Sequence, residues 1–325
     1  MKPFVSLFVS LVFICLSSFA QAPASAPQSH FNTSVDLVKH GKFSLAASVL
    51  EKEVQVPILT GVERGRVCAL LAYTYKQQGR FDLAEKAFNH ALRLMEKAGD
   101  LSNDYAATLD LYASMLMTTG ELDTAAKALG EATHVYERLE NHRGLSQIHT
   151  HNAELLIERH KYKQAEKRLA EARAEALLAN ASFTAVSEID ATTGWLAIAT
   201  GRYRDGVAAY SAALEKCRGE LGEGNAITGW SYLLLGKAQR LNHNVLEAKS
   251  DMQKGLAILK MTEGTNSLRY LAGELAYSEL LERAGSHAEA ARINSDANTT
   301  IRNMGSSHCA QCTVSVWGLR HQGGL

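Results

Sequence analysis

Small side chains recur at fixed offsets from seven residues that each end one helical pattern and precede another. We call these seven positions the turn residues, and successive ones are 38, 41, 40, 41, 42 and 42 positions apart. They are Gly41, Gly79, Gly120, His160, Gly201, His243 and Gly285. The stretch GRFDLAEKAFNHAL, residues 79–92, is the clearest copy of the pattern. Self-similarity at a period of this length indicates a repeat architecture.

Three columns of small residues define the unit. The positions seven before each turn residue hold Ser34, Ala72, Ala113, Ala153, Gly194, Gly236 and Ser278. The positions five after it hold Ala46, Ala84, Ala125, Ala165, Gly206, Ala248 and Ala290. The positions twelve after it hold Glu53, Ala91, Ala132, Ala172, Ala213, Gly255 and Ala297. Large apolar residues such as Phe81 and Phe88 occupy the second and ninth positions after most turn residues.

These columns predict a helix, a tight turn and a second, antiparallel helix in each unit. Small residues on both sides of the turn let two helix backbones approach closely, while large residues fill the space between neighbouring units. Only four prolines occur in the 325 residues, none of them after Pro57, and period-two alternation is nearly absent. We therefore predict an all-α chain of about seven helix-turn-helix units over residues 29–303, with residues 21–28 as a linker.

The unit resembles the tetratricopeptide repeat. The small residue before the turn, the Gly-x-aromatic turn and the Ala, aromatic, Ala second helix are similar to that family's signature, and the likeness covers residues 29–303. The period exceeds the usual ~34 residues and is similar to the longer variety of kinesin light chains, most clearly in LEKCRGELGEGNAITGWSYLLLGKAQR, residues 214–240. The family's proline at unit ends is absent except near Pro57. The resemblance implies a right-handed superhelix whose first helices line a concave, partner-binding groove.

The inward positions of each first helix are expected three, six, ten and thirteen residues before the turn residue. In order along the chain they include Arg66, Tyr73, Lys76, Asp110, Ser114, Met117, Gln147, Thr150, Glu154, Ile157, Glu188, Trp195, Ile198, Trp230, Leu233, Lys237, Arg240, Leu275, Glu279 and Glu282. Among these we select Tyr73, Lys76, Trp195, Trp230, Lys237 and Arg240 as candidate binding residues.

Trp195, Trp230, Lys237 and Arg240 form the strongest part of this prediction. Aromatic residues and arginine dominate interface energetics when they are desolvated, and Lys and Arg bind carboxylates. The alternative is that both tryptophans pack between helices while both cations are solvated. The lysine-and-asparagine clamp of chaperone-binding family members is not visible, because no inward position holds asparagine. We expect a protein or peptide partner, and the alternative is a structural or oligomerising module.

Catalysis, metals and cofactors have no strong signal in the sequence. GxSxG, Walker and GxGxxG elements are missing, so we expect no enzyme and no cofactor. His149, His151, Glu154 and Glu158 lie close together, and the last three share a helical face, but without HExxH spacing we expect structural or solvated histidines and no metal site. The 34 basic and 34 acidic residues balance, so no general attraction to nucleic acid is expected.

The first twenty residues are predicted to be a signal peptide. Lys2 precedes an apolar run from Phe4 to Phe19, and Ser18-Phe19-Ala20 provides the small residues of a cleavage site after Ala20. The run is short for a membrane span, which needs ~20 apolar residues, so no stable membrane insertion is expected after cleavage. The prediction is a secreted or periplasmic protein. A retained anchor and, without cleavage, a cytoplasmic regulator are the alternatives.

Residues 304–325 form a tail or cap that the repeat does not explain. Cys309 and Cys312 form a CxxC motif, for which an exported protein favours a local disulfide. Reduced structural cysteines, or redox or metal chemistry, remain as alternatives. Cys68 and Cys217 lie three units apart and are not expected to pair.

Overall fold

The computed structural model describes residues 26–306, which form fourteen α-helices and confirm the all-α prediction. The helices are paired: α2 (Ala26–Lys39) with α3 (Phe43–Glu53), α4 (Gly61–Gln77) with α5 (Phe81–Lys97), α6 (Asn103–Thr119) with α7 (Leu122–Arg138), α8 (His142–Glu158) with α9 (Tyr162–Leu178), α10 (Phe183–Ala199) with α11 (Tyr203–Leu221), α12 (Ala226–Leu241) with α13 (Val245–Thr262), and α14 (Leu268–Arg283) with α15 (His287–Ser306). Within the described residues α2 starts at Ala26 and α15 ends at Ser306, while the predicted array covers residues 29–303.

Each pair is joined at one of the turn residues, and all seven adopt a positive φ of between 57° and 86°. At Gly79 the N–H donates to the carbonyl of Lys76, and the next N–H, of Arg80, donates to the carbonyl of Tyr75. These bonds satisfy the last carbonyls of α4 in the manner of a Schellman motif. His160 and His243 adopt the same left-handed conformation, which histidine tolerates better than most residues.

The first and second helices of the pairs begin differently. The first helices α4, α6, α8, α12 and α14 are capped by the side chains of Thr60, Ser102, Asn141, Asn225 and Ser267. Thr60 also forms a capping box with Glu63. The second helices α3, α5, α7, α9, α11 and α13 begin two residues after the turn residue without a side-chain cap. The tight turn therefore sets the start of each second helix.

The three columns of small residues lie in the core. Ala84 and Ala91, together with Phe88 between them, have no exposed surface, and at position 206 a Cβ would lie 2.6 Å from Cδ1 of Ile198. Glu53, the exception in the third column, is buried as well, and burial raises the pKa of its carboxyl to about 7. The column of large residues two positions after each turn residue is less well buried in the sixth unit, where Val245 is 44% exposed.

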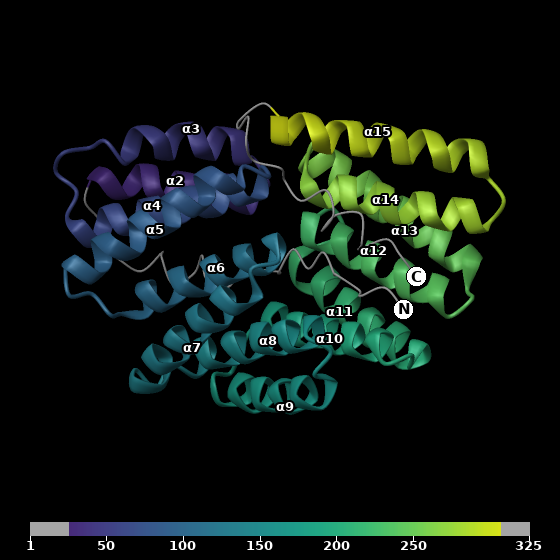
Figure 1. Ribbon diagram of the computed structural model, residues 1–325, viewed down its shortest axis with the longest axis horizontal. Coiled ribbons are helices and arrows are strands. Elements are labelled where there is room, and N and C mark those ends of the chain that lie inside the picture. The colour runs from purple at the N-terminus through teal and green to yellow at the C-terminus, as the bar shows by residue number, and fades with distance from the viewer. Residues whose placement is uncertain (1–25, 307–325) are drawn as a thin grey trace.

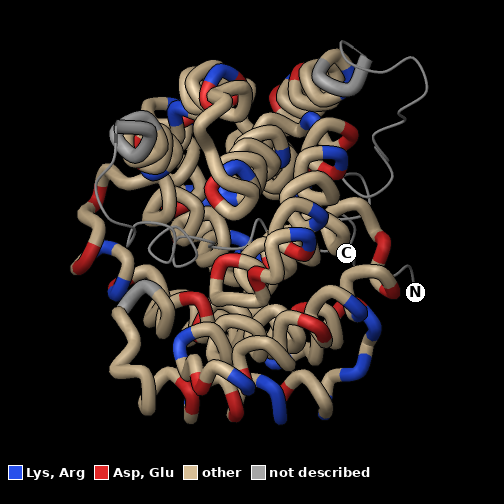
Figure 2. Tube along the Cα trace, turned by 90° about the vertical axis from the view of Figure 1, so that its left-hand side faces the viewer, with Lys and Arg blue, Asp and Glu red and all other residues tan. Residues whose placement is uncertain are grey.

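The pairs follow one another around a superhelix whose first helices form the inner layer. Consecutive first helices, from α2 and α4 to α12 and α14, contact one another, while the second helices lie outside them (Figure 1). Basic and acidic residues are interspersed along the chain rather than segregated (Figure 2). No helix within residues 26–306 is both long and apolar enough to cross a membrane.

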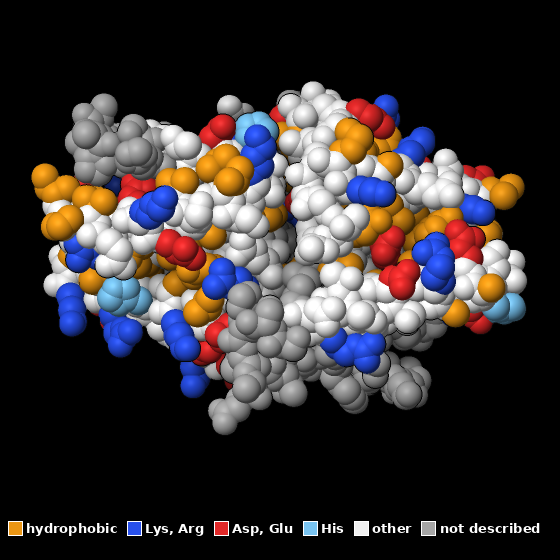
Figure 3. Space-filling view, turned by 90° about the horizontal axis from the view of Figure 1, so that it is seen from above, with side chains coloured by type: hydrophobic (Ala, Val, Ile, Leu, Met, Phe, Trp, Pro, Cys, Tyr) orange, Lys and Arg blue, Asp and Glu red, His pale blue; other side chains and the backbone are white. Residues whose placement is uncertain are grey.

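The first unit returns to the end of the sixth. A Cβ at Gly41 would lie 3.0 Å from Cγ of Glu263 and 3.2 Å from the carbonyl oxygen of Thr262, so the α2–α3 turn contacts the α13–α14 connection. Seen from above, the two ends of the array face each other across a narrow hollow (Figure 3). We call this contact the closure contact.

Gly41→Ala is expected to lower the free energy of unfolding more than Gly120→Ala does. Both glycines have a positive φ, which an L-residue adopts at a penalty of about 1 kcal/mol. A Cβ at Gly120 meets nothing within 4 Å, whereas one at Gly41 crowds the backbone of Thr262. Urea denaturation of the two variants separates turn strain from the closure contact. Equal losses would show that the contact contributes nothing to stability.

Candidate functional site

The inward positions of consecutive first helices are joined by side-chain bonds. Nζ of Lys76 on α4 donates to Oγ of Ser114 on α6 at 2.7 Å, and Nη2 of Arg240 on α12 lies 3.2 Å from Oε2 of Glu279 on α14. Lys76 also interacts electrostatically with Glu154 on α8. We call this continuous stripe on the first helices the inner face.

A buried acid–base cluster occupies the inner face of α6, α8 and α10. Nδ1 of His151 donates to Oδ1 of Asp110 at 2.5 Å, and Nε2 of the same ring lies 3.4 Å from Oε1 of Glu188. Oε1 of Glu154 accepts a hydrogen bond from Thr192 at 3.1 Å. The side chains of Asp110 and His151 have no exposed surface. The cluster therefore joins three consecutive units through charged groups shielded from solvent.

Burial and neighbouring charge shift the protonation equilibria of these groups. Burial raises the pKa of Glu154 to about 7 and lowers that of Lys76 to about 8. Burial alone would also lower the pKa of His151, but the Asp110 carboxylate holds it well above its usual value of 6.5. Burial raises the pKa of Glu188 as well. The imidazolium of His151 is thus stabilised between carboxylates.

Glu154→Gln is expected to flatten the dependence of stability on pH. Because the pKa of Glu154 is higher in the folded than in the unfolded chain, folding loses stability as pH rises from about 4.5 to about 7. The glutamine amide would keep the Thr192 bond and lose this ionisation. The variant should gain about 2 kcal/mol relative to wild type between about pH 5 and about pH 8 in urea denaturation. Glu85→Gln, at an exposed site on α5, controls for the substitution itself, and parallel profiles for wild type and Glu154→Gln would contradict the expectation.

Of the cationic candidates of the second half, Arg240 is buried and Lys237 is partly exposed. The Arg240 side chain is only 4% exposed, and Lys237 is partly buried. Burial lowers the pKa of both Lys237 and Arg240, and the Glu279 carboxylate opposes this. Burial also raises the pKa of Glu279 to about 6. The cations therefore share a carboxylate supplied by the protein itself.

The aromatic candidates are also buried. Trp195 and Trp230 are each 5% exposed and belong to the hydrophobic core of the second half of the array, while Tyr73 belongs to the core of the first half. The structure thus brings Lys76 to the inner face beside Ser114, and it places both tryptophans in packed surroundings, as the alternative interpretation expects. Their role in binding stays a prediction.

The four inward positions omitted one that the structure uses. His151 and Thr192 both lie nine residues before their turn residues, and both bond to inward positions of a neighbouring helix. A helical stripe runs through positions i, i+3, i+4 and i+7. Adding the ninth position to the thirteenth, tenth and sixth completes that pattern, so helical periodicity provides the missing signal.

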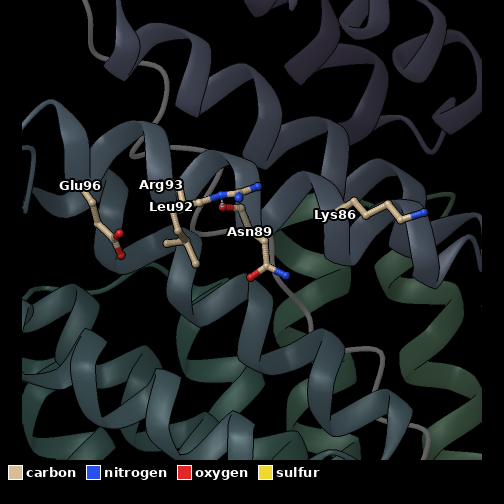
Figure 4. Close-up of a pocket in the computed structure, with 5 residues that line it drawn as sticks. All are labelled: Lys86, Asn89, Leu92, Arg93 and Glu96. Carbon is tan, nitrogen blue, oxygen red and sulfur yellow. Dashed lines mark hydrogen bonds between the residues drawn. The ribbon is translucent and has the colours of Figure 1, made fainter.

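One shallow pocket lies on the outer layer, over α5. It has a volume of about 450 Å³ and is lined by Lys86, Asn89, Leu92, Arg93 and Glu96 (Figure 4). Nε of Arg93 donates to the carbonyl of Asn89 at 3.1 Å. The repeat pattern did not indicate this pocket, because its residues lie outside the regular columns of small side chains.

Within residues 26–306, no group of three or more His, Cys, Asp or Glu side chains has the arrangement of a metal site. Cys68 and Cys217 are buried free thiols, and burial raises the pKa of Cys68 to about 11, which suppresses its thiolate. The predicted signal peptide and the predicted disulfide between Cys309 and Cys312 lie outside the described residues.

Comparisons with known proteins concern the repeat and the fold. Residues 65–138 match the family described as Tetratricopeptide repeat, and comparison with curated protein sequences finds no match. A Rap protein complexed with Competence and Sporulation Factor is 14% identical, covers 94% of this chain and 88% of its own, and gives a TM-score of 0.59. The apo form of RapI is 12% identical, covers 86% and 100%, and gives 0.60. A putative kinesin light chain of Podosopora anserina with TPR-like repeats is 16% identical, covers 73% and 94%, and gives 0.32.

The helix pairs of the structure and the sequence match point to the same repeat unit. One repeat unit is used throughout the array. In each of the seven helix pairs a left-handed turn residue joins two helices, and small residues lie at the crossing points. The family match covers two of these pairs, α4–α7. Residues 65–138 thus match the tetratricopeptide repeat family, and the other helix pairs of the described chain have the same fold.

Proposed function

We propose that this chain is a non-enzymatic scaffold that binds an extended segment of a peptide or protein partner along its inner face. The observation that carries the proposal is the distribution of buried charged residues. Within the described part of the chain, nine of the ten buried Asp, Glu, Lys, Arg and His side chains lie on first helices. The nine are Lys76, Asp104, Asp110, His151, Glu154, Glu188, Asp190, Arg240 and Arg269, and the tenth is Glu53 on α3.

Buried charge is expensive and is rarely retained for stability alone, because well-packed apolar residues serve at least as well. The second helices of the same units achieve burial mainly with alanine, leucine and methionine. A Rap protein of similar fold has been crystallised with Competence and Sporulation Factor, so this architecture accommodates a bound factor. The inner face is therefore the surface we assign to the partner.

Photo-crosslinking tests this assignment. Random short peptides are selected for binding to the purified full chain, and the selected peptides are then irradiated with variants carrying a photoreactive residue at Met117 or Asn89. Both positions are half-buried, but Met117 lies at an inward position on α6 whereas Asn89 lines the outer pocket. Crosslinking at position 117 alone is expected. Crosslinking at position 89 alone would move the site to the outer pocket, and failure to select any peptide would refute the function.

We also propose that the chain is exported, which the charged and apolar pattern of residues 1–20 supports. Expression of the full chain in a bacterial host, followed by N-terminal sequencing of the protein outside the cytoplasm, should give a first residue of Gln21. Recovery of the chain only in the cytoplasm with Met1 retained would overturn export and leave the scaffold proposal intact.

A further inference from the structure

Two buried carboxylates of the acid–base cluster have oxygens without a hydrogen-bond partner. They are Oε2 of Glu154 and Oε1 of Glu188, on residues that are 2% and 3% exposed. The remaining oxygen of Glu154 accepts from Thr192, and His151 approaches Glu188 no closer than 3.4 Å. Oε1 of Glu188 thus has the His151 ring as its ion-pair partner, whereas Oε2 of Glu154 has no protein donor, and most buried acceptors in native structures have one.

On α12, Arg240 has buried N–H donors that lack a hydrogen-bond acceptor. Its Nη2 lies 3.2 Å from Glu279, but Nε and Nη1 are buried without a hydrogen-bond partner. Guanidinium donors that lack an acceptor carry a desolvation penalty like that of the orphaned oxygen of Glu154. Two buried donors of Arg240 on α12 and one buried acceptor of Glu154 on α8 therefore lack a protein partner.

The charged groups that surround the two carboxylates differ from those that surround Arg240. Around the two carboxylates lie the acids Asp110, Glu154 and Glu188 and the bases His151 and Lys76, and Arg269 acts on Lys76 in turn. Around Arg240, the bases Lys237, Arg240 and Arg283 outnumber the acids Glu279 and Glu158. The inner face thus carries the acids Asp110, Glu154 and Glu188 on α6–α10 and the bases Lys237 and Arg240 on α12, with Glu279 on α14.

We propose that the inner face holds two ligand subsites of opposite charge and selects peptides that carry both a cation and an anion. In the acidic subsite, Glu154 and Glu188 accept hydrogen bonds from a lysine, arginine or N-terminal ammonium of the ligand. In the cationic subsite, Arg240 donates to a carboxylate of the ligand while Glu279 stays bound to Nη2. This inference rests on the proposed function, and it places the cation of the ligand at α8 and α10 and its anion at α12.

Peptide selection on charge-neutral variants tests the two subsites separately. Random short peptides are selected on wild type, on Glu154→Gln/Glu188→Gln and on Arg240→Gln/Glu279→Gln. The second double variant removes both members of the Arg240–Glu279 ion pair and so leaves neither of them unpaired, while Lys237 loses the Glu279 carboxylate. Thermal melts confirm that each variant folds. Arg159→Gln, which alters a pair with Asp123 beside the α8–α9 turn, is the matched control.

Peptides selected on wild type should be enriched in both Lys or Arg and Asp or Glu. The Glu154→Gln/Glu188→Gln pool should lose the basic enrichment only, and the Arg240→Gln/Glu279→Gln pool the acidic enrichment only. The Arg159→Gln pool should match that of wild type.

Single substitutions in a wild-type-selected peptide supply a second measurement that needs no protein variant. Neutralising its basic or its acidic residue should each weaken binding to wild type about tenfold, or about 1.4 kcal/mol. Neutralising the basic residue should have little further effect on the variant that lacks Glu154 and Glu188. Peptides that bind wild type equally well after neutralisation would overturn the subsites and leave the scaffold proposal standing. Failure to select any peptide would overturn both.

Discussion

Asp110→Ala is expected to lower the free energy of unfolding by about 3–5 kcal/mol, the range found when one partner of a buried ion pair is removed. Asp110 and His151 are both inaccessible to solvent and lie 2.5 Å apart across α6 and α8. Without the carboxylate, the imidazole keeps its desolvation penalty and loses its strongest partner. Urea denaturation followed by circular dichroism measures the loss.

A double-mutant cycle with His151→Ala separates the interaction from the two truncations. If the buried pair acts as a unit, the double variant should be less destabilised than the sum of the single variants, with a coupling of about 1–3 kcal/mol. Strictly additive effects would show that the short contact contributes nothing specific. Asp123→Ala is a useful comparison, because that aspartate pairs with Arg159 while 98% of its side chain is exposed. It should change stability by less than about 1 kcal/mol.

Gly255→Ala should also destabilise the array severely, by about 2–3 kcal/mol, because it separates two helix backbones. A Cβ at this position of α13 would lie 2.6 Å from the carbonyl oxygen of Gly229 and 2.9 Å from Cγ of Leu233, both on α12. A backbone oxygen cannot rotate away as a side-chain end does, so α12 and α13 would have to move apart. Thermal denaturation monitored by circular dichroism reports the effect.

Gly130→Ala is the matched control and should have the opposite sign. Gly130 lies within α7 and is exposed, and a Cβ added there would meet nothing within 4 Å. Alanine is favoured over glycine in an open helix by roughly 0.8–1 kcal/mol. A Gly255→Ala variant as stable as Gly130→Ala would mean that the close crossing of α12 and α13 is not required.

The architecture was predictable because it rests on local requirements that the sequence states directly. A left-handed turn favours glycine, and a close helix crossing demands a small residue, so Gly79 and Ala84 each predict one feature of the unit without reference to distant residues. Repetition of the same demands along the chain then defines the array. His160 and His243 could be placed only through this spacing, since neither residue is a strong turn signal on its own.

The candidate site was less predictable, because it depends on how successive units are rotated. Sequence periodicity predicted that Asp110 and Glu188 face inward, but not that His151 would lie between them. It also could not determine that Arg240 would form an ion pair with Glu279. The tryptophans illustrate the same limit. Where the helices curve around the interior, a residue that the register places inward can also be packed in the core, and Trp230 belongs to the core.

The closure contact joins the first unit of the array to the end of the sixth at one point. An open solenoid can gain or lose a unit at either end with little effect on the others, whereas here the α2–α3 turn fits against the connection between α13 and α14. Deleting one internal pair would shorten the path around the superhelix and leave Gly41 facing a different neighbour. The number of repeats is thus tied to the geometry of the molecule. A partner that reaches the inner face must enter along the superhelix axis, or the closure contact must open.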